Sequence, residues 1–150
     1  MTTDSNIQGR EANAHNAGWF ARNGPIAARV LMGLIFLIFG LNMLLNFLPQ
    51  PSKPLPEGAT DLAGALVRSG YLFQLTAWTE VICGALLLMN LFVPLALAFI
   101  APVVVNIVAF HVFLAPSGLG VAVVVLALNL YLACAYRRAY RPMLAARIRL

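Results

Sequence analysis

The chain has 150 residues, of which 61% are hydrophobic and 10% are charged, whereas roughly 25% of the residues in a soluble domain carry a charge. With a mean hydropathy of +0.85, this composition excludes an intrinsically disordered chain and is typical of a protein embedded in a lipid bilayer. The net charge of +5 would suggest nucleic acid as the partner of a soluble protein, but five of the ten cations lie in the last fourteen residues. We therefore expect the lipid bilayer, and no nucleic acid, as the surroundings of this chain.

The first 25 residues are polar and lack the apolar segment of a signal peptide, so we expect 1–25 to be a mobile tail. Four apolar stretches follow, each close to the roughly 20 residues that a helix needs to cross a bilayer. They are continuous and lack the alternation of barrel strands, which favours helices. The sequence predicts an all-α fold, a four-helix antiparallel transmembrane bundle over 26–144 with helices at 26–48, 71–89, 91–115 and 119–136, followed by a basic tail at 145–150.

Prolines and turn residues separate these helices. Pro25 suits the first turn of the first helix, and the prolines between 49 and 56 end it. The segment 90–94 predicts a tight turn, and Pro102 should kink the third helix. Residues 61–68 have an apolar stripe that predicts a short helix on the membrane surface, which fits a plain connector better than a lid.

Arginine and lysine are distributed unevenly between the two sides of this arrangement. Lys53 and Arg68 lie on one side, and eight arginines lie on the side of the two termini: Arg10, Arg22, Arg29, Arg137, Arg138, Arg141, Arg147 and Arg149. Because positive residues remain on the cytoplasmic side, we expect a multi-pass protein of the inner membrane with both termini in the cytoplasm.

Polar residues inside the apolar stretches are the candidates for function. At about 1.5 Å per residue, Asn42 lies about 9 Å from the outer end of its helix, Glu80 and Asn106 about 13 Å, and Asn129 about 15 Å. Asn46 and His111 lie within about 6 Å of the same boundary. If these side chains face inward, they form a polar pocket with Asn46 and His111 near its mouth.

Glu80 is the strongest single candidate, because a charged side chain at the centre of a spanning helix costs roughly 2.5 to 3.5 kcal/mol. No cation lies at its depth, so we expect a protonated or strongly hydrogen-bonded carboxyl, held by Asn42, Asn106 or Asn129. Two interpretations stay open: a ligand or proton site, and a polar contact that only links helices.

The remaining residues have simpler interpretations. His111 is either a proton-handling or ligand-binding group or a polar end group of its helix. Gly33, Gly40 and Gly84 predict close helix packing. Cys83 and Cys134 form no CxxC pair and are expected to be buried thiols.

Several segments together resemble the DoxX family of small membrane proteins: Asn90-Leu-Phe-Val-Pro-Leu-Ala-Leu, Ala101-Pro-Val-Val-Val-Asn-Ile-Val-Ala-Phe-His111, Tyr131-Leu-Ala-Cys-Ala-Tyr-Arg-Arg-Ala-Tyr-Arg-Pro142, Thr79-Glu80 and Gly40-Leu-Asn42. The resemblance covers roughly 26–144 and implies a four-helix bundle in the bacterial inner membrane. Some relatives are subunits of quinone-linked sulfur oxidoreductases. The resemblance also leads us to expect a carboxylate in the fourth helix, where this chain has Asn129.

The sequence contains no thiol pair, glycine-rich nucleotide loop, or set of histidines for a metal or haem. A quinone needs only one or two hydrogen-bonding groups in an apolar cleft, which Glu80, His111 and the asparagines can supply. We therefore expect an accessory membrane subunit that binds a lipophilic molecule, with a quinone as the cofactor suggested, beside an oxidoreductase partner. The alternatives are a scaffolding module and, less favoured, a proton-coupled transporter, which would require a homo-oligomer.

Overall fold

The computed structural model describes residues 3–49 and 54–140, and within these ranges the chain forms helices and no strands. The elements in chain order are α1 (Thr3–Leu45), α2 (Glu57–Arg68), α3 (Leu72–Leu88), α4 (Val93–Phe113), the short 3₁₀ helix η1 (Pro116–Gly118), α5 (Leu119–Ala135) and α6 (Arg137–Tyr140). The predicted basic tail at 145–150 lies outside the described residues.

Four helical segments of the described chain are long and apolar enough to cross a membrane: Asn23–Leu45, Leu72–Met89, Val93–Phe113 and Pro116–Ala135. They agree with the four predicted spans to within a few residues at each end. The predicted short helix after the first span is also confirmed, as α2. The all-α architecture with four spanning helices is therefore confirmed, and the chain is a multi-pass membrane protein.

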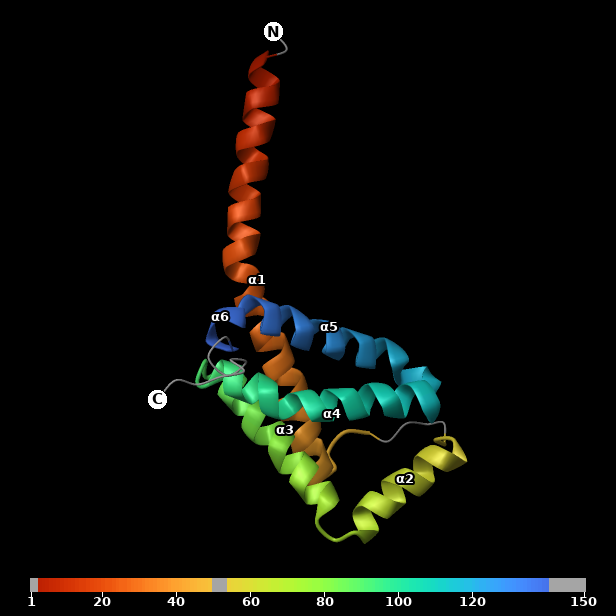
Figure 1. Cartoon of the computed structure of the whole chain (residues 1–150). Helices are drawn as coiled ribbons and strands as arrows, with labels where there is room; N and C mark the ends of the chain where they lie inside the picture. Colours follow the sequence, from red (N-terminus) through yellow and green to blue (C-terminus); the bar gives the residue numbers. More distant parts are fainter. Residues whose placement is uncertain (1–2, 50–53, 141–150) are drawn as a thin grey trace, which may run out of the picture.

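Helix α1 begins much earlier than the predicted span. It starts at Thr3, and its first half projects away from the other helices (Figure 1). Residues 3–22 include several alanines and long unbranched side chains, which favour helix over coil. Pro25 consequently lies inside α1 and not in its first turn, contrary to the sequence-based expectation, so the helix lacks one backbone hydrogen bond there.

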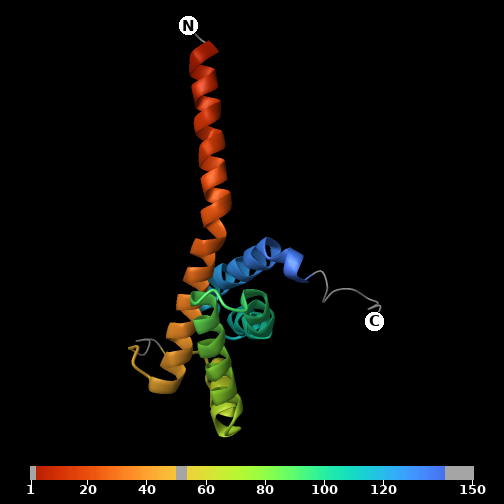
Figure 2. The same ribbon diagram turned by 90° about the vertical axis from the view of Figure 1, so that its left-hand side faces the viewer.

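The spanning helices form two antiparallel pairs. Helix α3 packs along α1, and α5 returns beside α4. Figures 1 and 2 show the α4–α5 pair lying steeply across the α1–α3 pair. This crossing decides which parts of each helix meet, and so it determines where cavities lie between the pairs.

The change of direction between α3 and α4 comes from the predicted tight turn. Asn90 and Phe92 both have positive φ angles, of 57° and 47°. The N–H of Leu91 donates to the carbonyl of Leu86 at 3.0 Å, and that of Asn90 donates to Leu87 at 3.3 Å. This pair of bonds is the Schellman arrangement that ends a helix, in which asparagine tolerates the left-handed conformation.

Close packing of α1 on α3 depends on the three predicted glycines. A Cβ atom on Gly40 would lie 2.8 Å from the Cβ of Glu80, and one on Gly84 would lie 2.6 Å from the backbone nitrogen of Leu37. A Cβ on Gly33 would lie 3.1 Å from the carbonyl oxygen of Gly84. The prediction that these glycines allow close approach of two helices is therefore confirmed.

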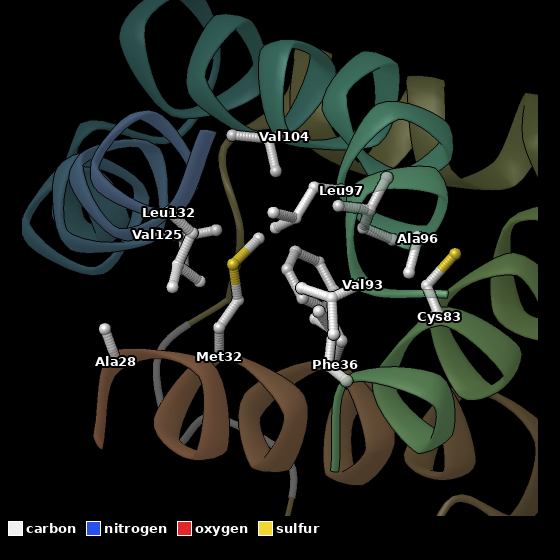
Figure 3. Packing of buried hydrophobic residues seen from close by; sticks show 12 residues of the cluster. Ala28, Met32, Phe36, Cys83, Val93, Ala96, Leu97, Val104, Val125 and Leu132 are labelled. Atoms are coloured by element: carbon white, nitrogen blue, oxygen red, sulfur yellow. The ribbon is translucent and has the colours of Figure 1, made fainter. Parts of the chain in front are cut away.

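The core where the two pairs meet is apolar. Figure 3 shows Met32 and Phe36 of α1 pointing toward Leu97 of α4 and toward Val125 and Leu132 of α5. All five side chains are buried almost completely. Glu80 and Asn129 do not belong to this cluster, and they line two separate cavities beside it.

Candidate functional site

A cavity of about 240 Å³ lies between the two helix pairs and is lined by side chains from all four spanning helices. Its walls are mostly aliphatic and aromatic, with Ile35 and Phe36 from α1 and Val125 from α5. Among the described residues that line it, the polar ones are Asn42, Glu80 and His111. We call this space the Glu80 cavity.

Glu80 faces the other helices and not the exterior, which is the orientation that a polar pocket requires. Its side chain is 6% exposed and borders the cavity. Gly40 lies opposite, and the absence of a side chain there leaves room for the glutamate. Among residues 23–49 and 54–140, no side chain or backbone group forms a hydrogen bond or ion pair with the Glu80 carboxyl. The expected hydrogen bonds from asparagine are therefore not formed in this part of the chain, and the carboxyl is available to a molecule in the cavity.

Asn42 lines the cavity, but its side chain also has a structural role. Its Oδ1 accepts a hydrogen bond of 2.7 Å from the backbone N–H of Leu48. Its carbonyl accepts one of 2.8 Å from the N–H of Asn46, which has a positive φ of 49°. The two asparagines therefore end α1, and Asn46 is exposed and does not line the cavity. An asparagine after an apolar run and shortly before a proline is a sequence signal for such a helix end.

His111 lies near the carboxyl end of α4, with its ring packed over Gly118 of η1. Its Nδ1 lies 2.9 Å from the carbonyl oxygen of Ala115. Because a carbonyl oxygen only accepts, this contact requires a hydrogen on Nδ1, and in the tautomer that carries its hydrogen there, Nε2 is an acceptor. The histidine is therefore held in one orientation at the cavity by the backbone that follows its own helix.

The predicted polar pocket is wrong for three of its six residues, because Asn106 and Asn129, like Asn46, do not line the cavity. Asn106 is exposed on the outside of α4 and does not line the Glu80 cavity. It is five residues from His111, which places the two side chains about 140° apart around the helix. Asn129 is buried, but it borders a different groove between α4 and α5. The crossing of the two helix pairs separates it from Glu80.

Arg29 has a role that sequence reasoning missed, because its position near the end of a span suggested only a topological charge. Its side chain is 8% exposed. Its Nη1 donates a hydrogen bond to the carbonyl of Leu87 and lies 3.3 Å from that of Leu88. A cation at the carboxyl end of a helix meets the negative end of its dipole. Arg29 of α1 therefore caps α3.

The two cysteines differ from the expectation of two buried thiols. Both are free, and Cys83 is buried beside Ala96. Cys134, in contrast, is exposed, because it faces outward from α5 toward the groove that Asn129 borders.

Comparison with known proteins agrees with the resemblance seen in the motifs. Residues 24–113, from the start of the first span to the end of α4, match the sequence pattern of the DoxX family. This is more than half of the chain, and it includes Asn42, Glu80 and His111. Searches of curated proteins and of solved structures gave no match. The chain belongs to the DoxX family.

Proposed function

We propose that this protein binds the ring of a lipophilic molecule, in the first place a quinone, in the Glu80 cavity, and that it does so as the membrane subunit of a redox system. The observation that carries the proposal is the meeting of Asn42, Glu80 and His111 in one otherwise apolar cavity formed by four helices. Sites for small molecules have this character: apolar walls and a few polar groups that orient the ligand.

The size of the cavity favours a molecule that is only partly enclosed. Its volume of about 240 Å³ lies below the roughly 300 to 1,000 Å³ of sites that enclose a whole drug-sized ligand. It is suited to a single ring and not to a ring with a long tail. Phe39 and Val121 line the cavity and are also exposed on the outside of the helices. A hydrocarbon tail can therefore leave between these side chains and continue into the lipid.

The polar groups are chemically suited to the two oxygens of a quinone. A protonated Glu80 carboxyl can donate a hydrogen bond to a carbonyl oxygen, and Nε2 of His111 can accept one from a quinol hydroxyl. Both groups can also hold a proton, and reduction of a quinone to a quinol requires two protons. The electrons would come from an oxidoreductase partner, which is consistent with an accessory role for this chain.

The distribution of the arginines supports one orientation of the protein in the membrane. Arg29, Arg137 and Arg138 lie at the same end of the molecule as the carboxyl end of α3. By the positive-inside rule we place this end, with both termini, in the cytoplasm of a bacterial cell. The Glu80 cavity then lies toward the outer half of the inner membrane.

The test is a titration of the purified protein in detergent with short-chain ubiquinone and menaquinone analogues. We expect saturable binding by the wild type and at least a tenfold loss in Glu80→Ala, about the effect of one hydrogen bond to a protonatable group. Asn106→Ala is the matched control, because Asn106 lies at a similar depth but outside the cavity. Equal binding by the wild type and Glu80→Ala would remove Glu80 from the proposal.

A scaffolding module is the second candidate, and the hydrogen bonds of the polar residues favour it. Asn42 and His111 each bond to nearby backbone, and the hydroxyls of Thr76 and Thr79 bond to carbonyls one turn earlier in α3. A scaffold predicts that no quinone binds and that Glu80→Gln leaves folding and activity of the complex unchanged.

A further inference from the structure

A second cavity, of about 390 Å³, opens between α4, α5 and α6 on the opposite side of the apolar core. Its apolar lining includes Leu97 and Ala101 from α4. The other side chains that matter here are Asn129 and Cys134 from α5 and Arg137 and Tyr140 from α6. We call it the Asn129 groove. It shares no lining residue with the Glu80 cavity, so the inference drawn from it is independent of the proposed function.

Asn129 is an unusual residue for the wall of an apolar groove. The side chain is 7% exposed, and its Nδ2 has no hydrogen-bond partner among the described residues. A buried donor without a partner is unfavourable, and such groups are normally satisfied by protein, water or ligand. In a groove that faces lipid, a ligand that carries an acceptor oxygen would satisfy this amide.

Arg137 places a positive charge at the end of the same groove. Glu80 is the last acidic residue of the sequence, so α4, α5 and α6 contain no carboxylate that could pair with this arginine. Tyr140 does not neutralise it either, because its hydroxyl, which donates to the carbonyl of Pro94 at 2.7 Å, is uncharged. Within the described part of the chain, the charge of Arg137 can therefore attract an anion, and it lies where a spanning helix ends, at the level of lipid head groups.

We propose that the Asn129 groove is a binding site for an anionic glycerophospholipid. The phosphate lies against Arg137, an ester carbonyl accepts a hydrogen bond from Nδ2 of Asn129, and an acyl chain follows Leu97 and Ala101. This ligand supplies an anion, an acceptor oxygen and a hydrocarbon chain in one molecule, and the lining of the groove offers a counterpart to each of the three. A quinone fits less well, because the groove offers neither a carboxyl nor an imidazole.

Native mass spectrometry of the delipidated full chain tests the proposal, with phosphatidylglycerol and phosphatidylcholine of identical acyl chains as probes. We expect phosphatidylglycerol to bind about fivefold more tightly, the effect of one arginine near the membrane surface. Arg137→Gln should abolish this preference. The control Arg138→Gln removes the neighbouring exposed arginine, which does not line the groove, and should retain the preference.

The amide is tested separately with Asn129→Leu, which keeps the size of the side chain. This variant should bind both lipids about fivefold more weakly and keep the ratio between them. Thermal unfolding of the lipid-free variants shows that each is folded. The proposal is overturned if the wild type binds both lipids equally, if Arg137→Gln and Arg138→Gln have the same effect, or if Asn129→Leu binds like the wild type. Dimers that disappear in Arg137→Gln would also overturn it, since a second copy would then occupy the groove.

Discussion

Gly84→Ala should separate α1 from α3, because the added methyl group would meet backbone on every near side. Its Cβ would lie 2.6 Å from the nitrogen and 3.0 Å from the Cα of Leu37, and 2.9 Å from the carbonyl oxygen of Gly33. Carbon atoms in favourable contact are about 3.5 to 4.0 Å apart. No side-chain rotation relieves a contact with backbone, so α1 has to move by close to an ångström.

The expected cost follows from two opposing effects. Overpacking of a tight interface costs typically 1 to 3 kcal/mol, and contact with rigid backbone places this case near the upper limit, at about 3 kcal/mol. Alanine is favoured over glycine within a helix by about 1 kcal/mol. The net loss in the free energy of unfolding should therefore be about 2 kcal/mol.

Gly120→Ala is the matched control. Gly120 lies in α5, and a Cβ there would have no atom within 4 Å. Only the helix preference then acts, so this variant should be more stable than the wild type by up to about 1 kcal/mol. Equilibrium unfolding in mixed micelles with increasing dodecyl sulfate, followed by circular dichroism, measures the difference of about 3 kcal/mol between the two variants. Equal midpoints for the two variants would refute the argument for backbone contact at Gly84.

The same unfolding assay checks two further predictions. Arg29→Met removes the donor to the carbonyls of Leu87 and Leu88 and should cost about 1 to 3 kcal/mol, with part of the loss restored in Arg29→Lys; unchanged stability in Arg29→Met would show that the helix end needs no cation. Asn46→Gly should be more stable than Asn46→Val by about 1 to 2 kcal/mol, because glycine accepts the positive φ of this residue and a β-branched side chain does not. Equal stability of the two Asn46 variants would contradict the helix-end role.

Part of the candidate site could be predicted from local sequence. Glu80 stands out because a carboxyl in an apolar stretch is too costly to face lipid, so its inward orientation follows from its chemistry. The position of His111 near the end of a span follows from residue count. Asn42 was correctly placed at the cavity, but its bond to Leu48 depends on the path of the chain after α1, which composition does not reveal.

The sequence by itself determined the number of spanning helices, their approximate ends and the contacts made by Gly33, Gly40 and Gly84, because apolar length, turn residues and missing side chains act locally. Only the tertiary structure decided which polar residues meet. Val121, Val125 and Asn129 follow one another at every fourth position of α5. Val121 and Val125 line the Glu80 cavity, yet Asn129 lines the other groove. The reason is geometric: depth along a helix follows from counting residues, but the rotation of each helix and the steep crossing of the two pairs arise from packing between segments far apart in the chain.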